Sequence, residues 1–106
     1  FTALLNEAIR TCGDKNRVVV LSIPDYSVTP FGKNSLKVAK EIADYNNINK
    51  SISVEMGIKY VDITPISLKA KDDLTYLAND KLHPSEKMYA EWVNEMFPFV
   101  ISALKN

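Results

Sequence analysis

The sequence contains very little of the two residue types that most often hold metals. Its 106 residues include one Cys, at position 12, and one His, at position 83. A disulfide within these 106 residues needs two Cys and is therefore excluded. A zinc cluster would need more ligands than one Cys and one His. We expect no metal and no cofactor. Cys12 lies on the apolar side of a helix-like run, so we expect a small buried side chain there rather than a reactive thiol.

The chain also lacks an excess of either charge and any long apolar run. Thirteen Lys and Arg residues balance thirteen Asp and Glu residues, which leaves no basic surplus for binding nucleic acid. The apolar runs at 18–21 and 96–101 are far shorter than the roughly 20 residues that span a bilayer. We therefore expect a soluble chain with no nucleic-acid partner and no transmembrane segment. Because residue 1 is Phe rather than Met, we expect a truncated start, and the compartment, export included, stays open.

Glycine and proline are scarce too, with three Gly and five Pro, whereas 46% of the residues are hydrophobic and 25% are charged. This composition excludes collagen-like and low-complexity chains and is typical of a globular protein with a packed core. A chain of this length holds at most one domain.

Apolar periodicity predicts an alternation of helices and strands. The expected elements are a helix over 4–12, a strand over 17–23, a loop over 24–34, a helix over 35–56, a strand over 58–63, a polar loop over 64–81 and a helix that starts at Pro84 and is broken or kinked at Pro98. The strand over 17–23 reads RVVVLSI, and such an apolar run without alternation is typical of a parallel sheet covered on both faces. We expect Met88, Trp92 and Met96 to pack in the core. The fold class is α/β, in which sites form at the loops that follow the strands.

Two parallel strands are too few for such a sheet. A lone pair would leave about three backbone polar groups of one strand unpaired on an apolar edge, at a cost of roughly 1–3 kcal/mol each. We therefore expect the Arg17–Ile23 strand to pair with a strand from another segment of the same protein, either a separate chain or a lost N-terminal part.

The residues around the only histidine are the best candidates for chemistry. Asp80 precedes His83 by three residues, and on a loop it can reach a ring nitrogen, fix the tautomer and stabilise the protonated imidazole. This pair is the base half of a hydrolytic triad. The alternative is a surface aspartate beside a histidine that merely precedes a helix.

The run Leu77–Ser85, LANDKLHPS, continued by Met88-Tyr89 and Trp92, resembles the Asp-x-x-His-Pro block of the SGNH/GDSL hydrolases. Residues 18–26 and 60–65 are similar to the fourth and fifth strands of lysophospholipase-like members. The resemblance implies a flavodoxin-like three-layer α/β/α sandwich with a five-stranded parallel sheet. Residues 1–106 would form its C-terminal part, with two strands and covering helices.

The same resemblance implies a lipase or esterase that hydrolyses carboxylic esters with a Ser-His-Asp triad. By matching positions, His83 would be the general base and acid, and Asp80 would orient it. The Gly-Asp-Ser nucleophile block, the Gly-x-Asn-Asp block and their oxyanion donors are absent. We assign no nucleophile in this chain, after considering Ser22, Ser27, Ser35, Ser67 and Ser85. We expect the chain to be inactive by itself.

Other residues and functions complete these expectations. Tyr26 and Phe31, in the loop after the first strand, are candidates for a substrate wall, with loop packing as the alternative. Asp62 suits a turn or cap, and the charged run 69–73 suits a solvated loop. The competing function is a catalytically inactive SGNH-fold binding module. A phosphoacceptor or nucleotide-binding domain would need an acidic cluster or a glycine-rich turn that the sequence lacks.

Overall fold

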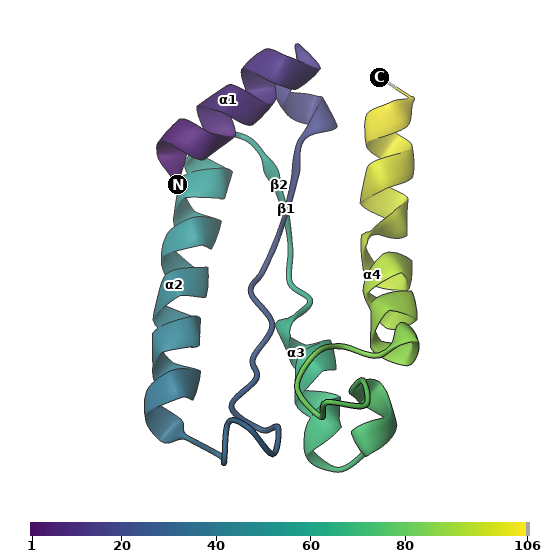
Figure 1. The fold of residues 1–106 in the computed structure, drawn as a ribbon. Helices are drawn as coiled ribbons and strands as arrows, with labels where there is room; N and C mark the ends of the chain where they lie inside the picture. The colour runs from purple at the N-terminus through teal and green to yellow at the C-terminus, as the bar shows by residue number, and fades with distance from the viewer. Residues whose placement is uncertain (106) are drawn as a thin grey trace.

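A computed structural model of the chain describes residues 1–105 and shows a two-stranded parallel sheet with helices around it. The elements are α1 (Thr2–Cys12), η1 (Lys15–Arg17), β1 (Val19–Leu21), α2 (Leu36–Glu55), β2 (Lys59–Val61), α3 (Thr64–Ser67), η2 (Leu68–Lys71), η3 (Leu74–Tyr76) and α4 (Glu86–Leu104). The two strands lie between α2 and α4, and α1 crosses one end of the molecule (Figure 1). The predicted α/β alternation is confirmed. None of the helices in this described part combines the length and apolar composition needed to cross a membrane.

The two strands pair in parallel, as the apolar run of β1 predicts, with Val20 opposite Tyr60 and α2 as the crossover. Both are shorter than expected. At the start of β1, the Asp14 side chain accepts a hydrogen bond from the Asn16 N–H (2.9 Å) and draws the next residues into η1. Beyond the end of β1, the backbone N–H and carbonyl of Ile23 are hydrogen-bonded to the side chain of Asn46 in α2 rather than to a neighbouring strand.

The ends of the two long helices follow from their capping residues. Ser35 caps α2, since its Oγ accepts the Val38 N–H (3.2 Å), as predicted. Ser85 caps α4, so Pro84 stands before the helix rather than in its first turn, which corrects the prediction. Of the expected break or kink at Pro98, the break does not occur, because α4 continues to residue 104. A proline removes only one N–H from the ladder, and the turns on either side of it hold.

The segment 64–81, predicted to be a polar loop, contains three short helical turns instead. Turns of three or four residues are shorter than the window in which periodicity can be read. Within the charged run, Ala70 is almost fully buried and belongs to the core. The prediction of a solvated loop therefore holds only for the charged side chains around it.

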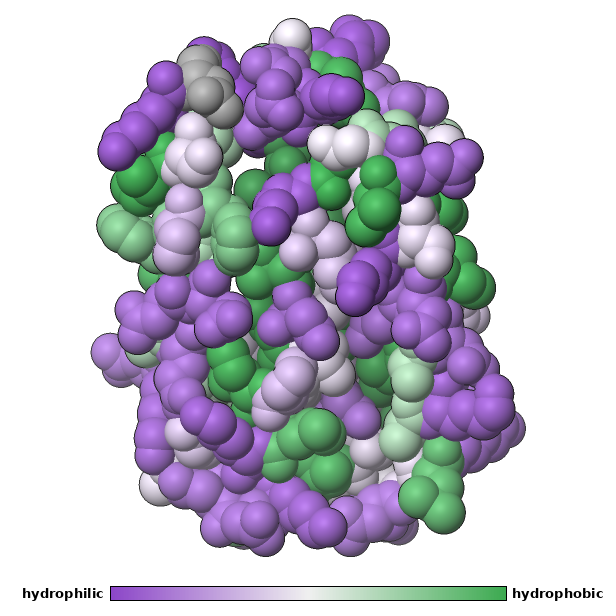
Figure 2. Space-filling view, turned by 180° about the vertical axis from the view of Figure 1, so that it is seen from behind, coloured by the Kyte–Doolittle hydropathy of each residue, from purple (hydrophilic) through white to green (hydrophobic). Residues whose placement is uncertain are grey.

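Two apolar clusters form the core. The larger one lies between β2, α4 and the turns of 64–76 and comprises Val61, Ile63, Ala70, Tyr76, Leu77, Met88 and Trp92. The smaller one joins α1 to the sheet through Leu5, Val18 and Ile58. Seen from behind, hydrophilic residues cover most of the outer surface and hydrophobic residues show along the middle (Figure 2). Cys12 is exposed, contrary to prediction, because it ends α1 beyond the residues that pack.

Candidate active site

The loop that carries Asp80 and His83 is closed on itself by the backbone. Leu77 and Pro84 form an antiparallel bridge, and the Ala78 N–H donates to the His83 carbonyl (2.7 Å). At the tip, the Lys81 N–H donates to the Ala78 carbonyl (2.9 Å). The chain therefore turns back within a few residues and holds the two candidate side chains at a fixed separation.

Ser85 attaches this loop to the elements on both sides. Its N–H donates to the Tyr76 carbonyl (2.9 Å) and its Oγ donates to the Thr75 carbonyl (2.6 Å). The same Oγ accepts the Met88 N–H as the cap of α4. One residue thus joins η3, the loop and α4, and the position of His83 is set by the packed core beneath these elements.

The structure brings Asp80 and His83 into direct contact. Asp80 Oδ2 is hydrogen-bonded to His83 Nδ1. The other carboxylate oxygen, Oδ1, accepts the backbone N–H groups of Leu82 and His83 at 3.0 Å each. The bond from the imidazole, followed by the two backbone bonds, lowers the pKa of Asp80 to about 2. Asp80 is therefore ionised at neutral pH, and we infer that the Nδ1 of neutral His83 carries the proton it shares.

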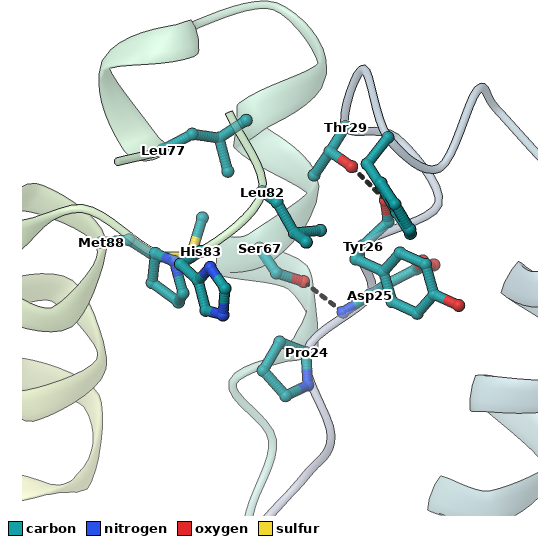
Figure 3. A pocket seen from close by; sticks show the side chains of 11 residues that line it. Pro24, Asp25, Tyr26, Thr29, Ser67, Leu77, Leu82, His83 and Met88 are labelled. Carbon is teal, nitrogen blue, oxygen red and sulfur yellow. Dashed lines mark hydrogen bonds between the residues drawn. The ribbon is translucent and has the colours of Figure 1, made fainter. Parts of the chain in front are cut away.

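His83 lies at the edge of a pocket of about 310 Å³. The pocket also contains Pro24 and Asp25, which follow β1, so it lies beyond the carboxyl end of that strand (Figure 3). The His83 side chain is 73% exposed. With Nδ1 occupied by Asp80, Nε2 is the ring nitrogen left to exchange a proton with a bound group.

Tyr26 and Phe31 line the same pocket as His83. Their ring centroids are 6.2 Å apart and the ring planes are tilted by 48°. The turn that presents them is tight: a Cβ at Gly32 would lie 2.2 Å from the Tyr26 carbonyl oxygen, so only glycine fits. Thr29 closes the turn, since its Oγ1 donates to the same carbonyl (2.7 Å).

Sequence reasoning missed two polar residues of this site, Asp25 and Ser67. The Asp25 N–H donates to Ser67 Oγ (2.9 Å), which ties the loop after β1 to α3 (Figure 3). Asp25 also accepts the Ser27 N–H (2.8 Å), and this Asp-x-Ser turn pattern is a signal that could have located the loop. Nothing in the sequence marks Ser67, because α3 is too short to be recognised.

The hydroxyls of Ser67 and Ser22 make hydrogen bonds to groups other than His83. Ser67 lines the pocket, but its hydroxyl donates to the Thr64 carbonyl. Ser22 is buried, donates to Asp62 Oδ1 (3.0 Å) and accepts the Ile63 N–H (2.8 Å). Within residues 1–105, no serine hydroxyl is hydrogen-bonded to the imidazole of His83. Asp62 accepts the Thr64 N–H (3.1 Å), as a turn residue does.

Comparisons of this chain with protein-family models, with curated proteins and with solved structures found no match.

Proposed function

We propose that this chain is the C-terminal part of an SGNH/GDSL-type esterase or lipase and supplies the Asp80–His83 half of a Ser-His-Asp triad. The observation that carries the proposal is the hydrogen bond between these two side chains at the edge of a pocket beyond the carboxyl end of β1. The motif places an aspartate and a histidine close in sequence. In the structure, Nδ1 of His83 is bonded to Asp80, its Nε2 is available, and the pocket beside the pair has space for a substrate.

The proposed reaction is two-step acyl transfer. His83 Nε2 takes the proton of a serine hydroxyl from a segment outside these residues, and the serine oxygen bonds to the ester carbonyl carbon. The carbonyl oxygen becomes an oxyanion, held by donors of that segment. His83 then gives its proton to the leaving alcohol as the C–O bond breaks. Water, deprotonated by His83, releases the acid and restores the serine.

Asp80 keeps the imidazole in the tautomer that this sequence needs. Its carboxylate is held by two backbone N–H groups, so Oδ2 points at Nδ1 without rearrangement. When His83 accepts the serine proton, the ionised Asp80 lies beside the new positive charge and stabilises it. An inactive binding module would have no use for an oriented, ionised pair of this kind.

The partner segment in this proposal pairs with the open edge of β1. Within residues 1–105, β1 has one strand neighbour, β2. The Ser22 N–H donates to the Val61 carbonyl (3.0 Å), and backbone groups alternate in direction along a strand. The N–H and C=O groups of Val19 and Leu21 therefore point away from β2, toward the open edge.

The surroundings of this edge also suit a further strand with its own helices. Leu21 and Ile23 are each 37% exposed. Large apolar side chains on the flanking helices are exposed as well, namely Tyr45 and Ile48 on α2 and Val93 and Phe97 on α4. A third strand and its covering helices would bury such groups and extend the structure toward a complete three-layer sandwich.

A serine-directed fluorophosphonate probe tests the function. The full reading frame that contains these residues would be expressed and labelled, with His83→Ala as the inactive variant and Lys105→Ala, at the far end of α4, as the matched control. We expect one labelled serine within a Gly-Asp-Ser block, normal labelling of the control and loss of labelling with His83→Ala. Absence of labelling in the folded wild-type protein would favour the inactive binding module.

A second measurement addresses the chain alone. Loss of the nucleophile from such a triad typically lowers kcat on the order of a millionfold. We therefore expect the 106-residue chain to show no hydrolysis of a chromogenic ester above that of buffer. Hydrolysis by the chain alone that disappears with His83→Ala would contradict the assignment of the nucleophile to another segment.

A further inference from the structure

The hydroxyl groups of Thr29 and Ser67 in the pocket wall already donate to backbone carbonyls. Thr29 Oγ1 donates to the Tyr26 carbonyl (2.7 Å) and accepts the Gly32 N–H (3.1 Å). Ser67 Oγ donates to the Thr64 carbonyl (2.5 Å) and accepts the Asp25 N–H. A hydroxyl has one proton to donate. Neither side chain can therefore donate to a ligand in the pocket without breaking a bond that holds the wall together.

The one carboxyl group of the lining, that of Asp25, also makes a hydrogen bond within the pocket wall. Asp25 is buried and its Oδ1 accepts the Ser27 N–H (2.8 Å) within its own loop. Its negative charge would repel a ligand carboxylate. Thr29 and Ser67 thus have no free hydroxyl donor for a ligand, and Asp25 disfavours an anionic one.

The rest of the lining is apolar and rests on the core. It comprises Pro24, Leu77, Leu82, Pro84 and Met88, together with the rings of Tyr26 and Phe31. Leu77 and Met88 are 7% and 2% exposed and belong to the larger core cluster, so that side of the pocket is a packed surface. The volume of about 310 Å³ is at the lower end of the range for small-molecule sites, roughly 300–1,000 Å³.

We propose that this pocket binds an uncharged apolar group, a short alkyl chain or a single aromatic ring, whose polar end faces His83. The inference rests on the proposed function, in which this group is the apolar end of the ester. It narrows the substrate class to esters of small apolar groups and excludes long-chain and anionic groups at this position. The specificity follows from the packed apolar side of the pocket and from the Thr29 and Ser67 hydroxyls, which are already bonded.

Primary alcohols of about three to ten carbons are the probes. They would be titrated into the 106-residue chain while NMR follows the Met88 methyl group and the His83 imidazole. Burial of each methylene should raise the affinity about fourfold until the pocket is full, after which the affinity stays constant. Diols and amino alcohols of the same length, polar at both ends, should bind at least tenfold more weakly. Absence of binding by the alcohols, or equal binding by the diols or amino alcohols, would overturn the proposal.

A pair of variants places the binding in this pocket. Leu82 is half-buried and lines it, whereas Leu74 is exposed on η3 and does not. Leu82→Trp should fill the pocket and weaken alcohol binding at least tenfold, while Leu74→Trp should leave it unchanged, with circular dichroism confirming that both fold. An equal effect of the two variants would contradict the site. Because binding needs no nucleophile, this result is independent of the fluorophosphonate result: either can fail while the other succeeds.

Discussion

Asp80 Oδ2 and His83 Nδ1 are hydrogen-bonded within a loop that is closed by the Ala78 N–H and the His83 carbonyl. Both members of the pair, and the backbone groups that orient the carboxylate, come from residues 80–83. This half of the proposed triad is therefore assembled by local structure alone. It needs the core only to place the loop beside the pocket.

The first prediction concerns the tautomer of His83. Asp80→Asn keeps the size of the side chain but replaces the acceptor facing Nδ1 with an amide that can donate, which favours the proton on Nε2. Nitrogen-15 NMR of the imidazole in the 106-residue chain should show this exchange. Under the proposed function, kcat of the complete protein should fall roughly ten-thousandfold. Asp73→Asn is the matched control, because Asp73 is hydrogen-bonded to Thr75 and Lys87 rather than to His83. An unchanged tautomer in Asp80→Asn would contradict the role of Asp80 in orienting His83.

The second prediction concerns stability in acid. The pKa of Asp80 is lowered from 3.8 to about 2, chiefly by its bond to His83. A carboxyl group whose pKa is lower in the folded state stabilises that state above its unfolded pKa, and this contribution is lost as the pH falls through the folded value. The difference in unfolding free energy between wild type and Asp80→Asn should be larger at about pH 4 than at pH 2. Urea unfolding from pH 6 to pH 2 measures it, and a difference that does not change over this range would rule out the linkage.

The third prediction separates close approach from backbone conformation at two glycines. A Cβ at Gly32 would lie 2.2 Å from the Tyr26 carbonyl oxygen and 2.6 Å from Ser27 Cα, so Gly32→Ala must move the pocket wall. We expect a loss of stability of about 1–3 kcal/mol together with weaker alcohol binding. Gly13 has φ +77° and open space around its Cα. Gly13→Ala should lower stability by about 1–2 kcal/mol and leave alcohol binding unchanged. If both variants bind the alcohols equally well, the proposed difference between the two glycines is wrong.

The fourth prediction concerns the free edge of β1. The Val20 and Ser22 amides face β2, whereas those of Val19 and Leu21 face outward. Hydrogen exchange followed by NMR in the 106-residue chain should therefore show slow exchange at the first pair and faster exchange at the second. In the full reading frame, the second pair should become slow as well. Equal protection of all four amides in the short chain would mean that the edge is already covered.

The sequence was sufficient for those parts of the molecule that local rules determine. The apolar run of β1 predicted a parallel strand, and Ser35 predicted the start of α2, because burial on two faces and helix capping each leave a distinct pattern. The spacing of Asp80 and His83 predicted a contact that the structure brings about. A loop of this length leaves the two side chains few other arrangements.

The sequence was insufficient where contacts join segments distant along the chain. Asn46 of α2 binds both backbone groups of Ile23, its Oδ1 accepting the N–H (2.7 Å) and its Nδ2 donating to the carbonyl (3.1 Å). No local pattern marks this asparagine. The same holds for Ser67, which closes the pocket wall on Asp25, and for Cys12, whose exposure depends on how far α1 packs along the sheet.

The self-closed loop of residues 78–83 has a consequence for protein engineering. Under the proposed function, the Asp80–His83 pair is complete within one short stretch, so separating this chain from the segment that carries the nucleophile would leave both pieces inactive and the histidine loop intact. Reunion would restore turnover without any refolding of the histidine loop. Under the proposed function, such a chain is a natural starting point for a split-enzyme reporter, in which a colour signal appears only when two fused proteins meet.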